Sequence, residues 1–388
     1  MSFFKRENPV YVVLDIGSAS VGGALLECTP NPKLLFTLRE DLPIREEFTP
    51  ARFLNDILAA ERRILNELAS HGHTPKKIHI VVSSPWYVGQ SRTRIERKPE
   101  TFTVTKNMLS DLEKSELEQF EKETATLHPS IFGNGYELLE LRNTSIKVNG
   151  YRTDHPVGEK GKSLELNFFA SLISKEIHRL FRETAATVWH HSDVVFHSHP
   201  VALTHVLETL YPGPESYLIF DVLGEVTDIL LVEHHSVKDT ASIPLGSHAL
   251  IRSLTAALKS LPADVLTLLH STTTSELEGQ RKEQFDQTVE LFRKSWTESL
   301  GTIFDTLSRE TLLPPKAYLV GSNDLSVLFA KFLQSEELRK YSMSGKPLNV
   351  IHINAGSVCQ FCDIEKGPQD PLLGLEGIYI SKVESLGK

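Results

Sequence analysis

Two aspartates in the sequence each end a short apolar run and precede a turn that contains glycine. Asp15 is followed by Ile16 and the turn Gly17–Ser20, and Asp221 is followed by a turn that contains Gly224. Small residues in such a turn let backbone N–H groups approach an anion without a Cβ in the way. A carboxylate at the end of the strand can then hold a metal ion, usually through water. The pattern therefore predicts phosphate-binding chemistry beside each aspartate.

Segments 11–27 and 217–233 share one pattern. Each begins with tyrosine, continues through three apolar residues to the aspartate, and passes through a turn into a second apolar run that ends in glutamate. Short apolar runs on both sides of a turn predict a β-hairpin. Two such hairpins, facing each other from duplicated domains, would hold the phosphates of a nucleotide from both sides.

Two other phosphate-binding motifs do not fit these residues. A P-loop requires lysine and then serine or threonine after its last glycine, and Gly22 is followed by Gly23 and Ala24. The dinucleotide-binding fingerprint has a different glycine spacing, and it runs into a helix, whereas the residues after Gly22 predict a strand.

Length and charge limit the remaining possibilities. A chain of 388 residues predicts two or more domains, and a net charge of −9 argues against binding to nucleic acid. The sequence shows no signal peptide and no apolar run long enough to span a bilayer. Three cysteines are too few for a disulfide framework in a chain of this length. We therefore expect a cytoplasmic protein.

The hairpins resemble the two phosphate motifs of the actin, Hsp70 and sugar-kinase superfamily. Segment 199–203 is similar to the connecting helix of that superfamily, and segment 319–323 to its adenosine motif. The resemblance implies bound ATP and Mg²⁺, with Asp15 and Asp221 organising the water around the metal ion. The nucleotide contacts that it implies come from Gly17, Ser18, Ala19, Ser20, Gly224, Glu225, Thr227, Gly321, Ser322 and Asn323.

An insertion between the hairpins makes the sequence resemble the bacterial FtsA/PilM branch. The implied fold is α/β, with duplicated actin-like (ribonuclease H-like) domains and an FtsA-type inserted α+β subdomain of SHS2 type. The first domain would comprise residues 1–83 and 173–205, with the C-terminal helix returning to it. The inserted subdomain would span 84–172, and the second domain 206–388, with a helical subdomain over 250–315.

Apolar stripes predict two of the helices. The first begins at the Thr49-Pro50 pair and places Phe53, Ile57, Leu58, Ile64, Leu65 and Leu68 inward. The second runs from Phe285 to Leu307 with an aromatic stripe, which indicates a core position rather than a ligand site.

Several positions depart from the superfamily pattern. Leu223, Glu225 and Val226 stand where phosphate 2 usually has small residues, and His199 stands where a glutamate is usual. A carboxylate at Glu225 would repel phosphates unless a cation intervened or the side chain pointed away. The adenosine motif also has Ser322 and Asn323 in place of glycines. Whether ATP is hydrolysed weakly or only bound stays open.

Two further groups could bind metal, although a structural role is favoured for both. Cys359 and Cys362 have Cys-x-x-Cys spacing without a second pair. Four histidines, from His190 to His199, surround Asp193, and the strand expected at 194–196 would place His197 and His199 on one face.

The resemblance implies a nucleotide-binding scaffold like FtsA, which assembles a membrane-associated cell-division complex through partners and self-associates into filaments or dimers. The alternative is a PilM-type cytoplasmic adaptor of a type IV pilus or secretion machine. The last residues cannot form the amphipathic membrane helix of FtsA proteins, so we expect membrane recruitment through a partner. A small-molecule kinase fits less well, because the insertion lies where such enzymes need a substrate pocket.

Overall fold

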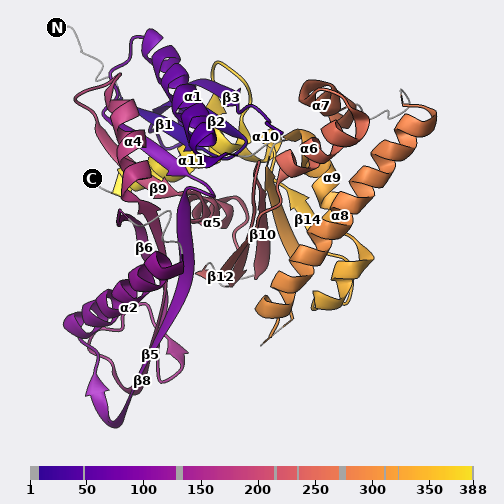
Figure 1. The fold of residues 1–388 in the computed structure, drawn as a ribbon. Coiled ribbons are helices and arrows are strands. Elements are labelled where there is room, and N and C mark those ends of the chain that lie inside the picture. The colour runs from indigo at the N-terminus through magenta and orange to yellow at the C-terminus, as the bar shows by residue number, and fades with distance from the viewer. Residues whose placement is uncertain are drawn as a thin grey trace, which may run out of the picture.

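The computed structural model describes residues 8–46, 49–127, 134–213, 216–233, 236–270, 277–309, 312–321 and 323–386. Two larger sheets and one smaller sheet organise the chain (Figure 1). In sheet order, the first contains β15 (Asp363–Ile364), β3 (Lys33–Asp41), β2 (Ser20–Glu27), β1 (Val10–Ile16), β4 (Lys77–Val82) and β9 (Asp193–Ser198). The second contains β12 (Ser236–Ile243), β11 (Thr227–Glu233), β10 (Tyr217–Val222), β13 (Lys316–Gly321) and β14 (Asn349–His352).

The two larger sheets repeat one topology. In each, three consecutive strands form antiparallel pairs, and two later strands add in parallel beside the first of the three. Asp15 lies opposite Gly22 in the first hairpin, and Asp221 lies opposite Asp228 in the second. The duplication predicted from the two similar segments is therefore confirmed by the pairing of the strands.

The segment between β4 and β9 builds the third sheet. Its strands are β5 (Tyr87–Thr103), β8 (Lys160–Ser174), β6 (Tyr136–Val148) and β7 (Tyr151–Arg152), in that order. Helix α2 (Lys106–Leu127) packs against this sheet through Phe120, and the Thr105 hydroxyl accepts the Met108 N–H at 3.1 Å as a helix cap. This inserted unit has the α+β character expected from the sequence.

Helices cover the outer face of each large sheet and fill the space between the sheets. Outside the first sheet lie α1 (Pro50–Ser70) and α4 (Lys175–Ala186); outside the second lie α6 (Ser247–Leu258), α7 (Pro262–His270), α8 (Gly279–Leu307) and α9 (Asn323–Leu333). Between them lie α5 (His199–Leu210) and α11 (Pro371–Leu386), in one core shared by both sheets. The chain also forms the short helices η2 (Glu336–Tyr341) and α10 (Ala355–Val358).

The sequence of strand β1 is apolar without alternation because both faces of the strand are covered. Val12 and Leu14 pack toward the outer helices, while Tyr11 and Val13 pack toward the central ones. A strand covered on both faces needs apolar residues at every position.

The two predicted helical stripes are also buried, except that Leu58 in α1 and Val289 and Leu307 in α8 are only partly covered. The domain boundaries expected from the sequence stay predictions. No helix in the described part of the chain has the length and apolar character that crossing a bilayer requires.

One carboxyl group interrupts the buried face of α1. Glu61 is fully buried, and both of its carboxylate oxygens lack a hydrogen-bond partner. Burial raises the pKa of Glu61 well above its ordinary value, and the neighbouring Arg62 opposes this only in part. A carboxyl in this position destabilises the fold, because it must be either desolvated as an anion or protonated.

We expect Glu61→Met to stabilise the protein by about 1–3 kcal/mol at neutral pH, since it removes the buried polar group. The folded-state pKa is raised, so the wild type loses stability as pH rises above the unfolded-state value of about 4.3. The gain should therefore be larger at pH 8 than at pH 5 in urea unfolding. Glu67→Met, at an exposed position of the same helix, is the control. An equal gain at both pH values would contradict this account.

Candidate functional site

The two turns predicted to bind phosphate meet directly. The Glu225 N–H donates a hydrogen bond to Ser18 Oγ at 3.0 Å, and a Cβ at Gly224 would lie 2.5 Å from the Ser18 carbonyl oxygen. The facing arrangement expected from the sequence is confirmed. At this point, however, the space between the turns is filled by protein contacts.

Other predicted contact residues hold the turns in shape. The Ala19 carbonyl accepts the Leu42 N–H at 2.8 Å, and Gly17 N–H donates to the Ser20 carbonyl at 3.2 Å. Thr227 is fully buried; its hydroxyl donates to the Leu245 carbonyl at 2.7 Å and accepts the Trp296 indole N–H at 3.2 Å. Each of these bonds occupies a backbone or hydroxyl group within the protein itself.

The adenosine motif lies next to the second turn. Gly321 pairs with Val222 and has φ +151°, and a Cβ there would lie 2.9 Å from the Val222 carbonyl oxygen. Asn323 begins α9, and Ser322 lies outside the described residues. The motif therefore lies where β13 ends and α9 begins, while its role in binding a base stays a prediction.

Asp15 is held by an arginine that the sequence analysis did not identify. Arg39 Nη2 donates to Asp15 Oδ2 at 2.7 Å, and Nη1 donates to Ser20 Oγ at 2.8 Å. The same guanidinium binds Asp370 through Nε at 2.5 Å and Nη2 at 3.2 Å. Burial raises the pKa of Asp370, but the charge of Arg39 outweighs this and lowers it.

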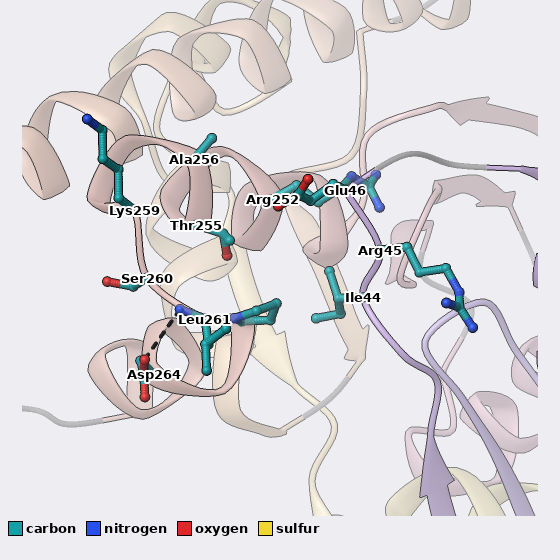
Figure 2. Close-up of a pocket in the computed structure, with 11 residues that line it drawn as sticks. Ile44, Arg45, Glu46, Arg252, Thr255, Ala256, Lys259, Ser260, Leu261 and Asp264 are labelled. Carbon is teal, nitrogen blue, oxygen red and sulfur yellow. Dashed lines mark hydrogen bonds between the residues drawn. The ribbon is translucent and has the colours of Figure 1, made fainter.

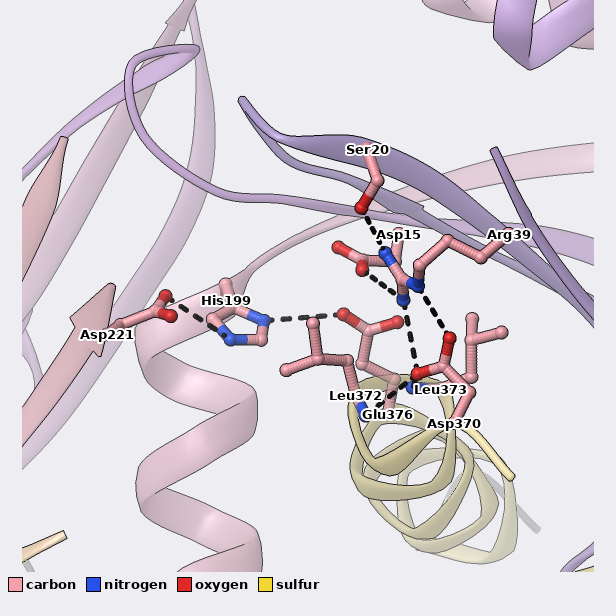
Figure 3. A network of polar contacts seen from close by, with 9 residues as sticks. All are labelled: Asp15, Ser20, Arg39, His199, Asp221, Asp370, Leu372, Leu373 and Glu376. Atoms are coloured by element: carbon pink, nitrogen blue, oxygen red, sulfur yellow. Dashed lines mark hydrogen bonds and ion pairs between the residues drawn. The ribbon is translucent and has the colours of Figure 1, made fainter. Parts of the chain in front are cut away.

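Asp221 connects to the same cluster through a histidine (Figure 3). His199 Nε2 lies 3.5 Å from Asp221 Oδ2, and its Nδ1 lies 3.3 Å from Glu376 Oε1. Burial raises the pKa of Asp221 to about 7, and burial with the nearby Asp15 charge raises that of Glu376 well above its ordinary value. Glu376 on α11 was also missed by the sequence analysis.

The Glu225 side chain binds neighbouring residues rather than pointing into solvent. Arg252 on α6 binds its two carboxylate oxygens at 2.8 and 2.7 Å, and His248 Nδ1 lies 3.2 Å from Oε1. Burial raises the pKa of Glu225, but these hydrogen bonds outweigh burial and lower it to about 2. Glu225 is therefore an anion at neutral pH.

A cavity of about 900 Å³ lies beside this ion pair (Figure 2). Arg252 and Thr255 from α6 form one wall, and Ile44 and Arg45, which precede α1, form another. Among the described residues, the lining contains none of the predicted phosphate contacts. The cavity and the two turns are thus separate features joined by Arg252.

The turns in this arrangement do not fit magnesium-bound ATP. The Glu225 N–H is already bonded to Ser18 Oγ, and Gly224 packs directly against the Ser18 backbone. Arg39 already neutralises Asp15. Ligand atoms of Asp15, His199 and Glu376 lie within 4.8 Å of one another, but a metal ion there would have to share Asp15 with the Arg39 guanidinium. The predicted metal pair of Asp15 and Asp221 is thus separated by His199 and Glu376.

Of the four histidines in the cluster, His197 and His199 are buried in separate contacts, while His190 and His191 are exposed. His197 Nε2 lies 3.0 Å from His79 Nδ1, whereas His199 faces Glu376 and Asp221. The prediction that His197 and His199 share a strand face is wrong, because β9 ends at Ser198 and His199 begins α5. Cys359 is exposed and Cys362 is buried, and both are free.

The sequence matches no protein-family model and no curated protein sequence. Among solved structures, a chain of the PilM–PilN type IV pilus biogenesis complex matches with a TM-score of 0.63 and 14% identity, over 96% of this chain and 96% of that chain. The MamK double helical filament matches with a TM-score of 0.46 and 11% identity, over 97% and 99%. The ethanolamine utilization protein EutJ from Carboxydothermus hydrogenoformans matches with 0.44 and 12%, over 96% and 90%. The α/β architecture is the actin-like fold expected from the sequence, and the first of these matches is the one that supports it.

The contact between the turns gives a direct prediction. Gly224→Ala would push a methyl group against the Ser18 backbone, so we expect a loss of about 1–3 kcal/mol in unfolding free energy. Gly213→Ala is the matched control, because a Cβ there meets nothing within 4 Å. Chemical unfolding of both variants measures the effect, and equal stability of the two would show that the turns are not in contact.

Proposed function

We propose that this protein is an actin-fold adaptor of PilM type that binds proteins of a pilus or secretion machine. The observation that carries the proposal is the direct contact between the two turns, through Ser18, Gly224 and Glu225. Phosphoryl transfer requires the reacting phosphates to lie between preorganised donors and a metal ion. Here the Glu225 N–H of the second turn donates to the Ser18 hydroxyl of the first, which favours a scaffold over a catalyst.

The structural similarity supports the adaptor over the other scaffolds considered. The PilM–PilN complex is a type IV pilus biogenesis complex, and its chain matches along nearly the whole of this one. The division role of FtsA proteins, placed first in the sequence analysis, has no comparable support. A cytoplasmic location with recruitment to a membrane by a partner accompanies the proposal, as does self-association into dimers or filaments.

ATP and Mg²⁺ are not part of this proposal. A ligand can bias a conformational equilibrium only if it binds the two states with different affinities. The turns already bind each other through protein groups, so nucleotide is not needed to join them. A true kinase is disfavoured for the same reason.

Partner binding tests the adaptor proposal. The protein would be co-expressed with the PilN homologue of the same genome and analysed by size-exclusion chromatography, with and without Mg-ATP. We expect a stable complex of unchanged yield in both conditions. ATP turnover would be measured beside the variant Asp15→Ala, and we expect no difference from wild type. Failure to form the complex, or turnover that disappears in Asp15→Ala, would contradict the proposal.

A further inference from the structure

Arg39 lies at the centre of the acidic cluster between the sheets. Its guanidinium contacts Asp15 at the end of β1, Ser20 at the start of β2, and Asp370 just before α11. Gly22 makes this path available, since a Cβ there would lie 2.6 Å from Arg39 Nη2. The arginine therefore joins the first turn to the C-terminal helix.

We propose that Arg39 is a built-in counter-cation that takes the place of a divalent metal ion at Asp15. A guanidinium has five N–H donors in a fixed planar arrangement, and here three of its nitrogens bind two carboxylates and a hydroxyl. A metal ion at this position would serve the same groups through oxygen ligands. The arginine supplies the positive charge from within the chain.

The contact network carries the effect of Arg39 to the second sheet. Asp370 accepts the N–H groups of Leu372 and Leu373 at 3.0 Å each, which caps α11. One turn further along this helix, Glu376 lies 3.3 Å from His199, and His199 lies 3.5 Å from Asp221. The two aspartates near the ends of β1 and β10 are thus connected through Arg39, helix α11 and His199.

The charges in this cluster explain why Arg39 excludes magnesium rather than assisting it. Asp15 is nearly inaccessible, at 3% side-chain exposure, and Arg39 itself is 19% exposed. A second cation placed against Asp15 would be repelled by the guanidinium at short range in a poorly solvated site. Displacing the arginine would leave a charged side chain without its partners, which is strongly unfavourable.

The role of Arg39 in partner binding rests on the adaptor proposal, because only an adaptor would use a fixed arrangement of the two halves. The halves would be held in one arrangement at all times, so the surface that meets a partner would be present without a nucleotide signal. The inference itself concerns which cation neutralises Asp15, and that can be measured on the isolated protein.

The test compares thermal melting of wild type, Arg39→Met, Arg39→Lys and the double variant Arg39→Met/Asp15→Asn. Arg39→Met keeps the length of the side chain without its charge, so we expect its melting temperature to fall by several degrees. The double variant should recover part of that loss, because it also removes Asp15, one of the two carboxylates that pair with Arg39. Arg63→Met is the control, since Arg63 is exposed and pairs with Glu40 on the surface.

Added magnesium chloride gives the decisive result. We expect millimolar Mg²⁺ to raise the melting temperature of Arg39→Met, where Asp15 lacks a cation, and to leave wild type and the double variant unchanged. Arg39→Lys keeps the positive charge, so we expect it to be insensitive to Mg²⁺ as well. It provides the comparison with wild type if Arg39→Met does not fold. Isothermal titration of wild type with Mg²⁺ and Mg-ATP should show no binding.

Three outcomes would overturn the inference: stabilisation of wild type by Mg²⁺ or Mg-ATP, an Arg39→Met protein as stable as the Arg63→Met control, or equal Mg²⁺ responses in Arg39→Met and the double variant. Loss of the PilN-type complex would contradict the adaptor proposal and leave this inference standing. Stabilisation of wild type by Mg²⁺ would contradict the inference about Arg39 and leave the adaptor proposal standing.

Discussion

The arrangement of this protein depends on neutralising carboxyl groups that lie buried between its two large sheets. Asp15, Asp221, Asp370 and Glu376 are all less than a tenth exposed, and one arginine lies among them. Burying an uncompensated charge costs several kcal/mol, so such a cluster needs cations, protons or hydrogen-bond donors. Arg39 forms ion pairs with Asp15 and Asp370, whereas raised pKa values favour protonation of Asp221 and Glu376. Each group thereby depends on a neighbour from a distant part of the chain.

The fold brings these neighbours together through its central helices. Helices α5 and α11 pack against each other and against both sheets, so that His199 at the start of one and Glu376 in the other meet. The strand ends carry Asp15 and Asp221 to the same region because the two sheets repeat one topology. The duplicated architecture thus brings the two aspartates together, while Arg39 from β3 and His199 from α5 lie against them.

The sequence predicted the local parts of this site better than its connections. Asp15 and Asp221 were found because each lies at the end of an apolar run before a turn, which is a signal within a few residues. Arg39, Arg252 and Glu376 were missed, since each contacts a partner brought near only by folding, as in the pair Arg39 and Asp370. The glutamate in the second turn indicated that either a cation lies nearby or the side chain points away, but the sequence could not say which.

Secondary structure was likewise predictable where its signal lies within a few residues, and not where it depends on pairing with a distant segment. The apolar stripes of α1 and α8 were predictable because helical periodicity is local, while the polar residues of β5 gave no strand signal. Strand β5 forms because β8 pairs with it along its length. His199 was placed on a strand because the apolar run before it has strand character. Pro200 follows directly and is the second residue of α5, and proline is well tolerated in the first helical turn.

A bound ligand and a side chain differ in what they allow a two-domain fold to do. A ligand that joins two halves can leave, and its concentration then sets the fraction of closed molecules. A side chain that joins them is always present, so the closed fraction is fixed by the sequence. The contacts of Ser18 with Glu225, and of His199 with Asp221 and Glu376, belong to this second kind. Contacts of this second kind join the two turns without a bound ligand, and under the proposed adaptor role a partner would meet that arrangement at all times.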